Sequence, residues 1–292
     1  MGPILSRHAY AKVNLHLAVG APYTDGYHPI ESIFALADLS DHIEMTYSIS
    51  DDFSISVTGL EAYCKTGEDT LTKAALLWYE RSQYPLSVHV HCEKQIPVKA
   101  GLGGGSSDAA SLLLLLQQAS GQGSLSLADL KEVALLVGSD VPFFLSGYSC
   151  ALVEGRGEKV RELALKPKHI LLAQPRGYSV STKDAYARLD ALLGRNELHQ
   201  RIPLKTVLAT LDQQTSSWRD VFFNDFEKCL EAPGFYEEVA LLWRKYEGFG
   251  SLSGSGSCWY FISEDEKSVL ELCSDLHNAF LDSVQLWCTK LI

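Results

Sequence analysis

Glycine fills four of the five positions from 101 to 105, within the segment "IPVKAGLGGGSSDAASLLLLL" of residues 96–116. Because glycine lacks a Cβ atom, its backbone can adopt positive φ and a ligand can approach it closely. Two serines, an aspartate and an apolar run follow, which predicts that a helix starts close to the glycines. The free N–H groups at a helix start bind anions, so this stretch favours phosphate binding.

Three interpretations of the glycine stretch compete. The Walker A loop is excluded, because it requires a Gly-Lys dipeptide and the chain contains none. The dinucleotide fingerprint G-x-G-x-x-G fails at its third glycine, where Ser106 stands, and the acidic residue needed about 20 positions later would fall in a predicted helix. A plain connector is disfavoured, since a linker has no need of two hydroxyls at the start of a helix. We therefore predict a phosphate cradle.

Polar residues in two other segments could act on a phosphorylated ligand. In "HAYAKVNLHLAV", apolar residues alternate with Lys12, Asn14 and His16, which predicts a half-buried strand with a polar face. In "GSDVPFF", Asp140 precedes a turn that contains proline. Taken alone, a lysine on such a face is usually solvated and such an aspartate usually caps a helix. Both alternatives stay open on these residues alone.

Periodicity and turn signals predict the elements of the first half of the chain. Strands are expected at residues 9–17, 43–47, 53–57 and 86–97, and helices at 69–84, 111–119 and 126–138. Asp69 or Thr70 should cap the first of these helices, and Ser126 with Asp129 forms a capping box for the last. His89 and His91 alternate with valines, so we interpret them as surface residues of a strand and not as metal ligands.

A composition shift at residues 163–175 predicts two domains, residues 1–165 and 166–292. The second half contains helical patterns at 181–194, 204–214 and 235–249, and a second glycine–serine loop that leads into a strand at 250–262. A further helix to residue 278 and a final strand at 283–292 complete it. Mixed strands and helices without strict alternation indicate the α+β class in each half.

Composition restricts the partners. The 25 basic and 36 acidic residues give a net charge of −11, which argues against a nucleic-acid or anionic-membrane surface. The seven cysteines are scattered without C-x-x-C spacing and are expected to be reduced core thiols. No signal peptide opens the chain, and the longest apolar run, residues 112–116, is far too short to span a bilayer. We expect a cytoplasmic protein, monomeric or a weak homodimer.

The order of these motifs resembles the GHMP kinases. The strand lysine and asparagine come first, P-x-x-x-G-L-G-G-G-S-S comes second, and "LSGSGSCW" at 252–259 matches the third motif. Within this superfamily, "AKVNLHL", "DGYH", "GSDVPFF" and "EGRGE" are similar to the kinases that act on cytidylated methylerythritol in isoprenoid synthesis. The resemblance implies a ribosomal-protein-S5-like domain 2 fold followed by a ferredoxin-like α+β domain. It also implies ATP-dependent phosphorylation of the 2-hydroxyl of that acceptor, with Mg²⁺ accompanying ATP.

The resemblance also implies roles for individual residues. Asp140 would be the base that takes the proton of the acceptor hydroxyl, and Lys12 would keep Asp140 ionised and stabilise the transferred phosphoryl group. Ser107 is the single candidate for a magnesium ligand. The acceptor would be bound by Asn14, Tyr27, His28, Lys94, Thr182 and Tyr186, with Tyr27 and Tyr186 stacking on the base. Lys94 could contact either the nucleotide or the acceptor diphosphate, and both alternatives stay open. The ATP phosphates would be wrapped by Pro97, Val98, Lys99, Ala100, Gly101, Leu102, Gly103, Gly104, Gly105, Ser106 and Ser107.

The chain departs from this family in places, and other functions compete. Lys99 adds a charge beside the cradle, "EDTL" at 68–71 replaces a common E-D-N-L, and residues 190–235 match nothing in the family pattern. Another GHMP small-molecule kinase, such as a mevalonate, homoserine or galactose kinase, would not need "DGYH" or Tyr186. A nucleotide-binding protein without turnover would not need Lys12 and Asp140.

Overall fold

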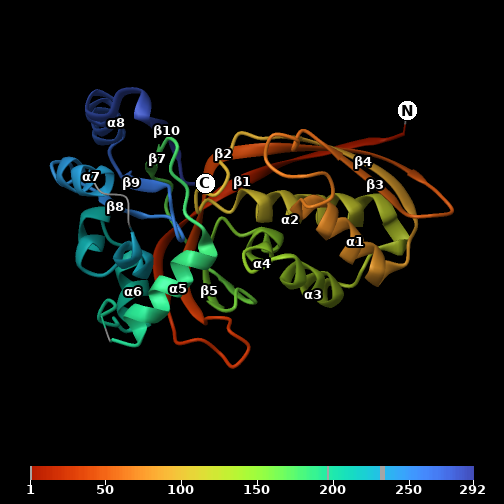
Figure 1. The fold of residues 1–292 in the computed structure, drawn as a ribbon, viewed down its shortest axis with the longest axis horizontal. Coiled ribbons are helices and arrows are strands. Elements are labelled where there is room, and N and C mark those ends of the chain that lie inside the picture. The colour runs from red at the N-terminus through yellow and green to blue at the C-terminus, as the bar shows by residue number, and fades with distance from the viewer. Residues whose placement is uncertain (1, 196, 231–233) are drawn as a thin grey trace.

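The computed structural model describes residues 2–195, 197–230 and 234–292, which are built around two β-sheets (Figure 1). In the first sheet the strand order is β3-β4-β2-β5-β6, and β1 pairs with β2. Its strands are β1 (Ile4–Val19), β2 (Ile30–Ile49), β3 (Ser54–Thr58), β4 (Leu86–Glu93), β5 (Cys150–Gly155) and β6 (Lys159–Glu162).

Four helices pack on one face of this sheet, as Figure 1 shows. They are α1 (Thr70–Ser82), α2 (Gly104–Ser120), α3 (Leu127–Val137) and α4 (Val141–Ser146). The apolar run of α2 is almost fully buried against α1, α3 and the strands, which explains why this helix is hydrophobic on nearly every side. The predicted caps are confirmed, since Asp69 accepts from the Thr72 N–H at 2.7 Å and Ser126 accepts from the Asp129 N–H at 3.2 Å.

The second sheet is antiparallel throughout, with the order β10-β7-β9-β8. Its strands are β7 (His169–Pro175), β8 (Phe249–Leu252), β9 (Trp259–Ser263) and β10 (Val284–Lys290). The helices of this half are α5 (Thr182–Leu193), α6 (Leu204–Leu211), α7 (Phe235–Trp243) and α8 (Glu266–Phe280). The 3-10 turns are η1 (Gly121–Gly123), η2 (Thr215–Asp220), η3 (Asp225–Cys229) and η4 (Leu281–Ser283). This strand order is that of a ferredoxin-like sheet, so the expected α+β fold is confirmed.

One hydrophobic core joins the two sheets. Along β7, Leu171 and Ala173 face α7 and α8, while Ile170 and Leu172 pack with residues of β1 and β2. This alternation follows from the period of two along a strand. The chain end reinforces the junction, because Leu291 forms a bridge with Ala37 of β2. None of the helices in the described ranges is long and apolar enough to cross a membrane.

Several expected elements differ from the structure. The helix expected at 235–249 ends at Trp243, and Phe249 is already the first residue of β8. β2 is one strand from residue 30, whereas a strand was expected only at 43–47, because polar residues around Asp41 interrupt the apolar alternation. The side chain of Asp41 is buried and accepts from the N–H groups of Gln95 and Ile96, which are distant in sequence. α2 begins at Gly104, not at residue 111. The polar face of β1 is buried rather than solvated, with Lys12 3% and Asn14 2% exposed.

Candidate active site

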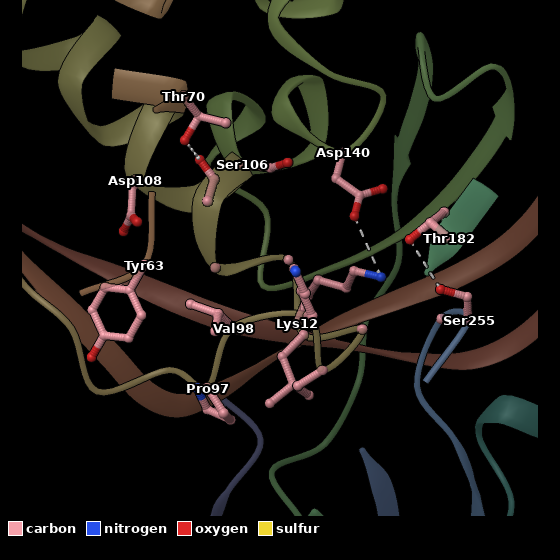
Figure 2. Close-up of a pocket in the computed structure, with 18 of the residues that line it drawn as sticks. Lys12, Tyr63, Thr70, Pro97, Val98, Ser106, Asp108, Asp140, Thr182 and Ser255 are labelled. Carbon is pink, nitrogen blue, oxygen red and sulfur yellow. Dashed lines mark hydrogen bonds and ion pairs between the residues drawn. The ribbon is translucent and has the colours of Figure 1, made fainter. Parts of the chain in front are cut away.

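A cleft of about 620 Å³ runs past the three motifs found in the sequence. Its walls come from β1, the loop before α2, the start of α4, α5 and the loop between β8 and β9 (Figure 2). Figure 2 shows Tyr63 and Val98 at one end of the cleft and Thr182 with Ser255 at the other, and Tyr186 follows Thr182 by one turn of α5. The glycine-rich loop and the side chains of Lys12 and Asp140 line the same cleft. The strand, loop and turn motifs therefore meet in one place.

The glycine-rich loop is fixed by its neighbours on both sides. The Lys12 N–H donates to the Leu102 carbonyl at 2.9 Å, and the Ser253 hydroxyl donates to the Gly101 carbonyl at 2.9 Å. Gly101 has φ +78°, and a Cβ atom there would lie 2.0 Å from the Ser253 carbonyl oxygen. Gly103 has φ +70°, and a Cβ there would lie 3.0 Å from Cγ of Lys12. Close packing against Lys12 and against the loop at 252–259 thus requires glycine at both positions.

The start of α2 presents unpaired N–H groups to the cleft. Ser106 and Ser107 donate their N–H groups to the Gly103 carbonyl. Within the described residues, the N–H groups of Gly103, Gly104 and Gly105 have no hydrogen-bond partner. All three of these glycines line the cleft. Unpaired donors at a helix start, with the positive end of the helix dipole behind them, form a site for phosphate oxygens.

Lys12 and Asp140 face each other across the cleft, and Figure 2 shows their side chains extended toward one another. The distance from Lys12 Nζ to Asp140 Oδ2 is 3.5 Å, and Nζ also donates to Asn14 Oδ1 at 2.5 Å. Asn14 in turn donates to the buried Ser32 hydroxyl at 3.0 Å, which fixes the amide orientation. The Lys12 side chain is 4% exposed and that of Asp140 is 30% exposed. A buried cation is thus held next to a carboxylate that an incoming molecule can reach.

Asp140 stands at the N-cap position of α4, but its side chain makes no capping hydrogen bond. The alternative that this aspartate is a helix cap therefore has no support in the structure. Its carboxylate turns toward Lys12 instead. Burial, together with the charge of Asp140, raises the pKa of the cleft-lining Tyr186 to about 12.

At the Tyr186 end, aromatic side chains shape the cleft. The ring of Tyr186 lies 4.9 Å from His28 and 5.0 Å from Phe226, the latter nearly perpendicular. Both ring nitrogens of His28 already have partners, the Gly20 carbonyl at 2.9 Å and Asp190 Oδ1 at 3.3 Å. One helical turn before Tyr186 on α5, the hydroxyl of Thr182 lies 3.3 Å from that of Ser255.

Comparisons with known proteins identify the family of this chain. The model of the GHMP kinases N terminal domain matches residues 69–148. A 4-diphosphocytidyl-2-C-methyl-D-erythritol kinase of Bacteroides thetaiotaomicron is 33% identical over 267 residues, which cover 89% of this chain and 93% of the relative. The chain belongs to this kinase family. It is also 35% identical to the kinase of that name from Prosthecochloris aestuarii, over 94% of this chain and 95% of the relative.

A solved structure supports the same assignment. The crystal structure of a 4-(cytidine 5'-diphospho)-2C-methyl-D-erythritol kinase superposes with a TM-score of 0.76 at 30% identity, covering 98% of this chain and 99% of that one. The chain is therefore a kinase that uses ATP as co-substrate, and the GHMP kinase fold expected from the resemblance is confirmed.

The kinase cleft contains most of the residues predicted from the sequence, but not all of them. Lys12, Asn14, Lys94, Asp140, Thr182 and Tyr186 line it, together with Pro97 to Ser106 of the loop. Ser107 is buried and Ser106 borders the cleft instead. His28 reaches the cleft only through its contact with Tyr186. Tyr27 is 56% exposed and lies under Arg156, whose guanidinium carbon is 4.9 Å from the ring centroid.

A buried charge cluster that no sequence motif predicted lies beside the loop. Lys94 Nζ donates to Asp108 Oδ2 at 2.8 Å and also to Asp41, and all three side chains are at most 6% exposed. Burial raises the pKa of Asp108 to about 7, against the opposing effect of Lys94. Asp108 Oδ1 is buried without a hydrogen-bond partner. Only the presence of Lys94, seven residues before Gly101, and of Asp108 just after the glycines could have suggested a site here, and Asp41 carried no local signal.

Proposed function

We propose that this kinase transfers the γ-phosphoryl group of ATP to the 2-hydroxyl of 4-diphosphocytidyl-2-C-methyl-D-erythritol, a step of isoprenoid biosynthesis. The names of the relatives support this acceptor, and the cleft supports the chemistry. The observation that carries the proposal is the Lys12–Asp140 pair at 3.5 Å, beside unpaired N–H groups at the start of α2.

The nucleotide phosphates would lie along Pro97 to Ser107, against the free N–H groups of the glycines. Tyr63, Leu60 and Val98 form an apolar surface at that end of the cleft, suited to the flat face of a base. Lys94 belongs to the same end, because a Cβ atom on Gly104 would lie 3.2 Å from its Nζ. We therefore assign Lys94 to the nucleotide rather than to the acceptor diphosphate.

In the chemical step, Asp140 would accept the proton of the acceptor hydroxyl as that oxygen attacks phosphorus. Lys12 contributes a fixed positive charge where negative charge develops, and Asn14 keeps its ammonium in place through the 2.5 Å hydrogen bond. Phosphoryl transfer requires mainly such positioning and charge stabilisation. Since both groups are held by the scaffold before the substrate binds, little reorganisation is needed during the reaction.

A magnesium ion would take most of its ligands from the phosphates and water. The described residues contain no group of three or more His, Cys, Asp or Glu side chains that could hold a metal ion. Mg²⁺ in kinases is usually bound through phosphates and one or two protein groups, so such a cluster is not required. Of the two loop serines, Ser106 fits this role, because its side chain borders the cleft and that of Ser107 is buried. When bound, the ion shields the charge of the phosphates.

The acceptor base would lie at the Tyr186 end. Tyr186 offers one stacking face, and Thr182, one turn before it on α5, offers a hydroxyl beside that of Ser255. For His28 to bind the edge of cytosine, a ring nitrogen must exchange its contact with Asp190, because both nitrogens are engaged. Tyr27 stacks on the base only if the loop that carries it moves from Arg156 toward the cleft.

The test is a coupled assay of ADP release with ATP, Mg²⁺ and a set of acceptors. We expect rapid release with the cytidylated diphosphate and slow release with uncytidylated methylerythritol phosphate, mevalonate, homoserine and galactose. Equal rates with and without the cytidyl group would overturn the assignment of the acceptor. The division at residues 165 and 166, the cytoplasmic location and the oligomeric state stay predictions.

A further inference from the structure

A second cavity, of about 860 Å³, is lined mostly by residues of the segment 190–235, which matches nothing in the family pattern, and otherwise by residues between 243 and 251. It opens between residues 199–203, the end of η2, the end of α7 and β8. Its floor is aromatic, formed by Phe222, Phe223, Trp243 and Phe249, each at most 8% exposed. None of these residues lines the kinase cleft. The cavity is therefore a separate concave surface with an apolar floor.

Arg219 is held in a fixed orientation at the wall of this cavity. Its Nε donates to the Gly248 carbonyl at 2.8 Å and its Nη2 donates to the Tyr246 carbonyl. The guanidinium carbon lies 4.8 Å from the centroid of the Trp243 ring. Within the described residues, no carboxylate lies within ion-pair distance of this guanidinium. A preorganised arginine with a remaining Nη1 donor and no counter-charge is suited to an anion.

Two more arginines border the same cavity. The guanidinium carbon of Arg244 lies 5.9 Å from the Trp243 ring centroid, and the described residues place no carboxylate beside it. Arg201 is already neutralised by the buried Asp225 at 3.0 Å. On a chain with net charge −11, two cations without partners around one aromatic ring are unusual.

The two acidic residues that line the cavity, Asp220 and Glu227, form no ion pair with Arg219 or Arg244 among the described residues. Glu227 Oε1 accepts from the Ser251 hydroxyl at 2.6 Å and from the Leu252 N–H at 3.0 Å, which turns it toward β8. Burial raises the pKa of Glu227, so its charge is more easily neutralised than that of an exposed glutamate.

We propose that this cavity binds a small organic phosphate ester, with the phosphate between Arg219 and Arg244 and the carbon skeleton on the aromatic floor. Arginine binds phosphate oxygens in a bidentate manner, and guanidinium groups stacked on an indole keep their N–H groups directed outward. The apolar rings supply an affinity that inorganic phosphate cannot use. The site is independent of the kinase cleft, so the proposal does not rest on the acceptor assigned above.

The test uses the full-length protein labelled with 5-fluorotryptophan and titrated with phenyl phosphate under ¹⁹F NMR. The chain has five tryptophans, and a Trp243→Phe variant assigns the resonance of Trp243. We expect that resonance to shift with a saturating curve and a Kd below about 1 mM. The resonance of Trp78, buried beside α2, serves as an internal control and should not move.

Arg244→Gln should weaken binding at least about tenfold, which corresponds to the loss of one charge-assisted contact. This variant is preferred to Arg219→Gln, since the guanidinium of Arg244 donates no hydrogen bond to a backbone carbonyl among the described residues, whereas that of Arg219 donates two. The matched control is Arg195→Gln, which removes an exposed arginine that pairs with Glu197 at 3.7 Å, and it should leave the Kd unchanged. A Trp243 resonance that does not shift, or shifts equally in Arg244→Gln, overturns the site. Equal affinity for inorganic phosphate overturns the assignment to an ester.

Discussion

The carboxylate of Asp140 is close to a buried cation and takes no part in capping its helix, so its removal should affect chemistry more than folding. We expect Asp140→Asn to lower kcat by about 10²–10⁴-fold, the usual contribution of a general base. ATP affinity should be nearly unchanged, because the glycine loop is intact. Single-turnover kinetics and a nucleotide titration check both. If the variant keeps more than about a third of wild-type turnover, Asp140 is not the general base.

The two tyrosines assigned to the base differ in position, which predicts different kinetic effects. Tyr186 lines the cleft, whereas Tyr27 is mostly exposed beneath Arg156. Tyr186→Ala should raise the KM for the acceptor. The factor should correspond to a loss of binding free energy on the order of 1–3 kcal/mol, as for other base–aromatic stacks. Tyr27→Ala should have the smaller effect unless its loop closes on the substrate, and neither should change the KM for ATP. Steady-state kinetics with each substrate varied in turn measures this, and a larger effect for Tyr27 would show that the loop closes.

Asp108 makes stability depend on pH in an identifiable direction. Its pKa is raised from 3.8 to about 7 by burial, so the folded state binds its proton more tightly than the unfolded state does. The stability from this group is therefore complete below pH 3.8 and is lost as the pH rises through about 7. Asp108→Asn should be more stable than wild type at pH 8, by an amount on the order of 1–3 kcal/mol, and should show no advantage near pH 4.

Urea unfolding at several pH values tests this prediction. Asp129→Asn is the control with the opposite sign, because hydrogen bonds from Ser126 and Arg81 lower the pKa of Asp129. That variant should be less stable than wild type at pH values above the ordinary pKa of an aspartate, and the difference should fade at low pH. A constant difference between Asp108→Asn and wild type across the pH range would mean that Asp108 keeps its charge in the fold.

At the scale of elements, the glycine-rich loop is fixed by the loop between β8 and β9. We expect Gly101→Ala to destabilise the protein by more than about 3 kcal/mol, because its Cβ would meet the Ser253 carbonyl oxygen at 2.0 Å in addition to the strain of positive φ. Gly67→Ala is the matched control, since Gly67 has φ +83° with nothing within 4 Å of a Cβ atom. It should cost only about 1–2 kcal/mol. Urea unfolding gives both values, and equal losses would show that the two loops can move apart.

Local signals predicted the elements that local interactions determine. The cap of α1 by Asp69, the strand β4 and the loop that opens a helix all depend on neighbours in sequence, and the structure confirms them. The full length of β2 was missed, because Asp41 is satisfied by N–H groups more than fifty positions away. The same limit applies to the site, since no spacing along the chain shows that Asp140 turns from its helix to Lys12 or that Tyr27 lies under Arg156. These placements depend on tertiary contacts.

At the scale of the whole molecule, the core shared by the two sheets predicts cooperative unfolding. Residues of β1, β2, β7 and β9 pack in one cluster, so neither sheet is buried without the other. We expect a single unfolding transition in urea. Hydrogen exchange with mass spectrometry, which monitors peptides of β4 and of β9 separately, should give the same midpoint for both strands. Two separate midpoints would indicate that residues 1–165 and 166–292 are independent folding units.

The segment from Phe222 to Glu227 is the wall between the two cavities. Phe222 and Glu227 line the aromatic cavity, Phe226 lines the kinase cleft, and Asn224 donates to the carbonyls of Leu252 and Gly254 at 2.8 Å. A ligand on one side that displaces this wall changes the free energy of binding on the other side. By thermodynamic linkage that coupling is reciprocal, so an ester that tightens acceptor binding by some factor must itself be bound tighter by the same factor when the acceptor is present. A metabolite that strengthens acceptor binding through the wall would then be retained best by enzyme molecules already occupied by substrate.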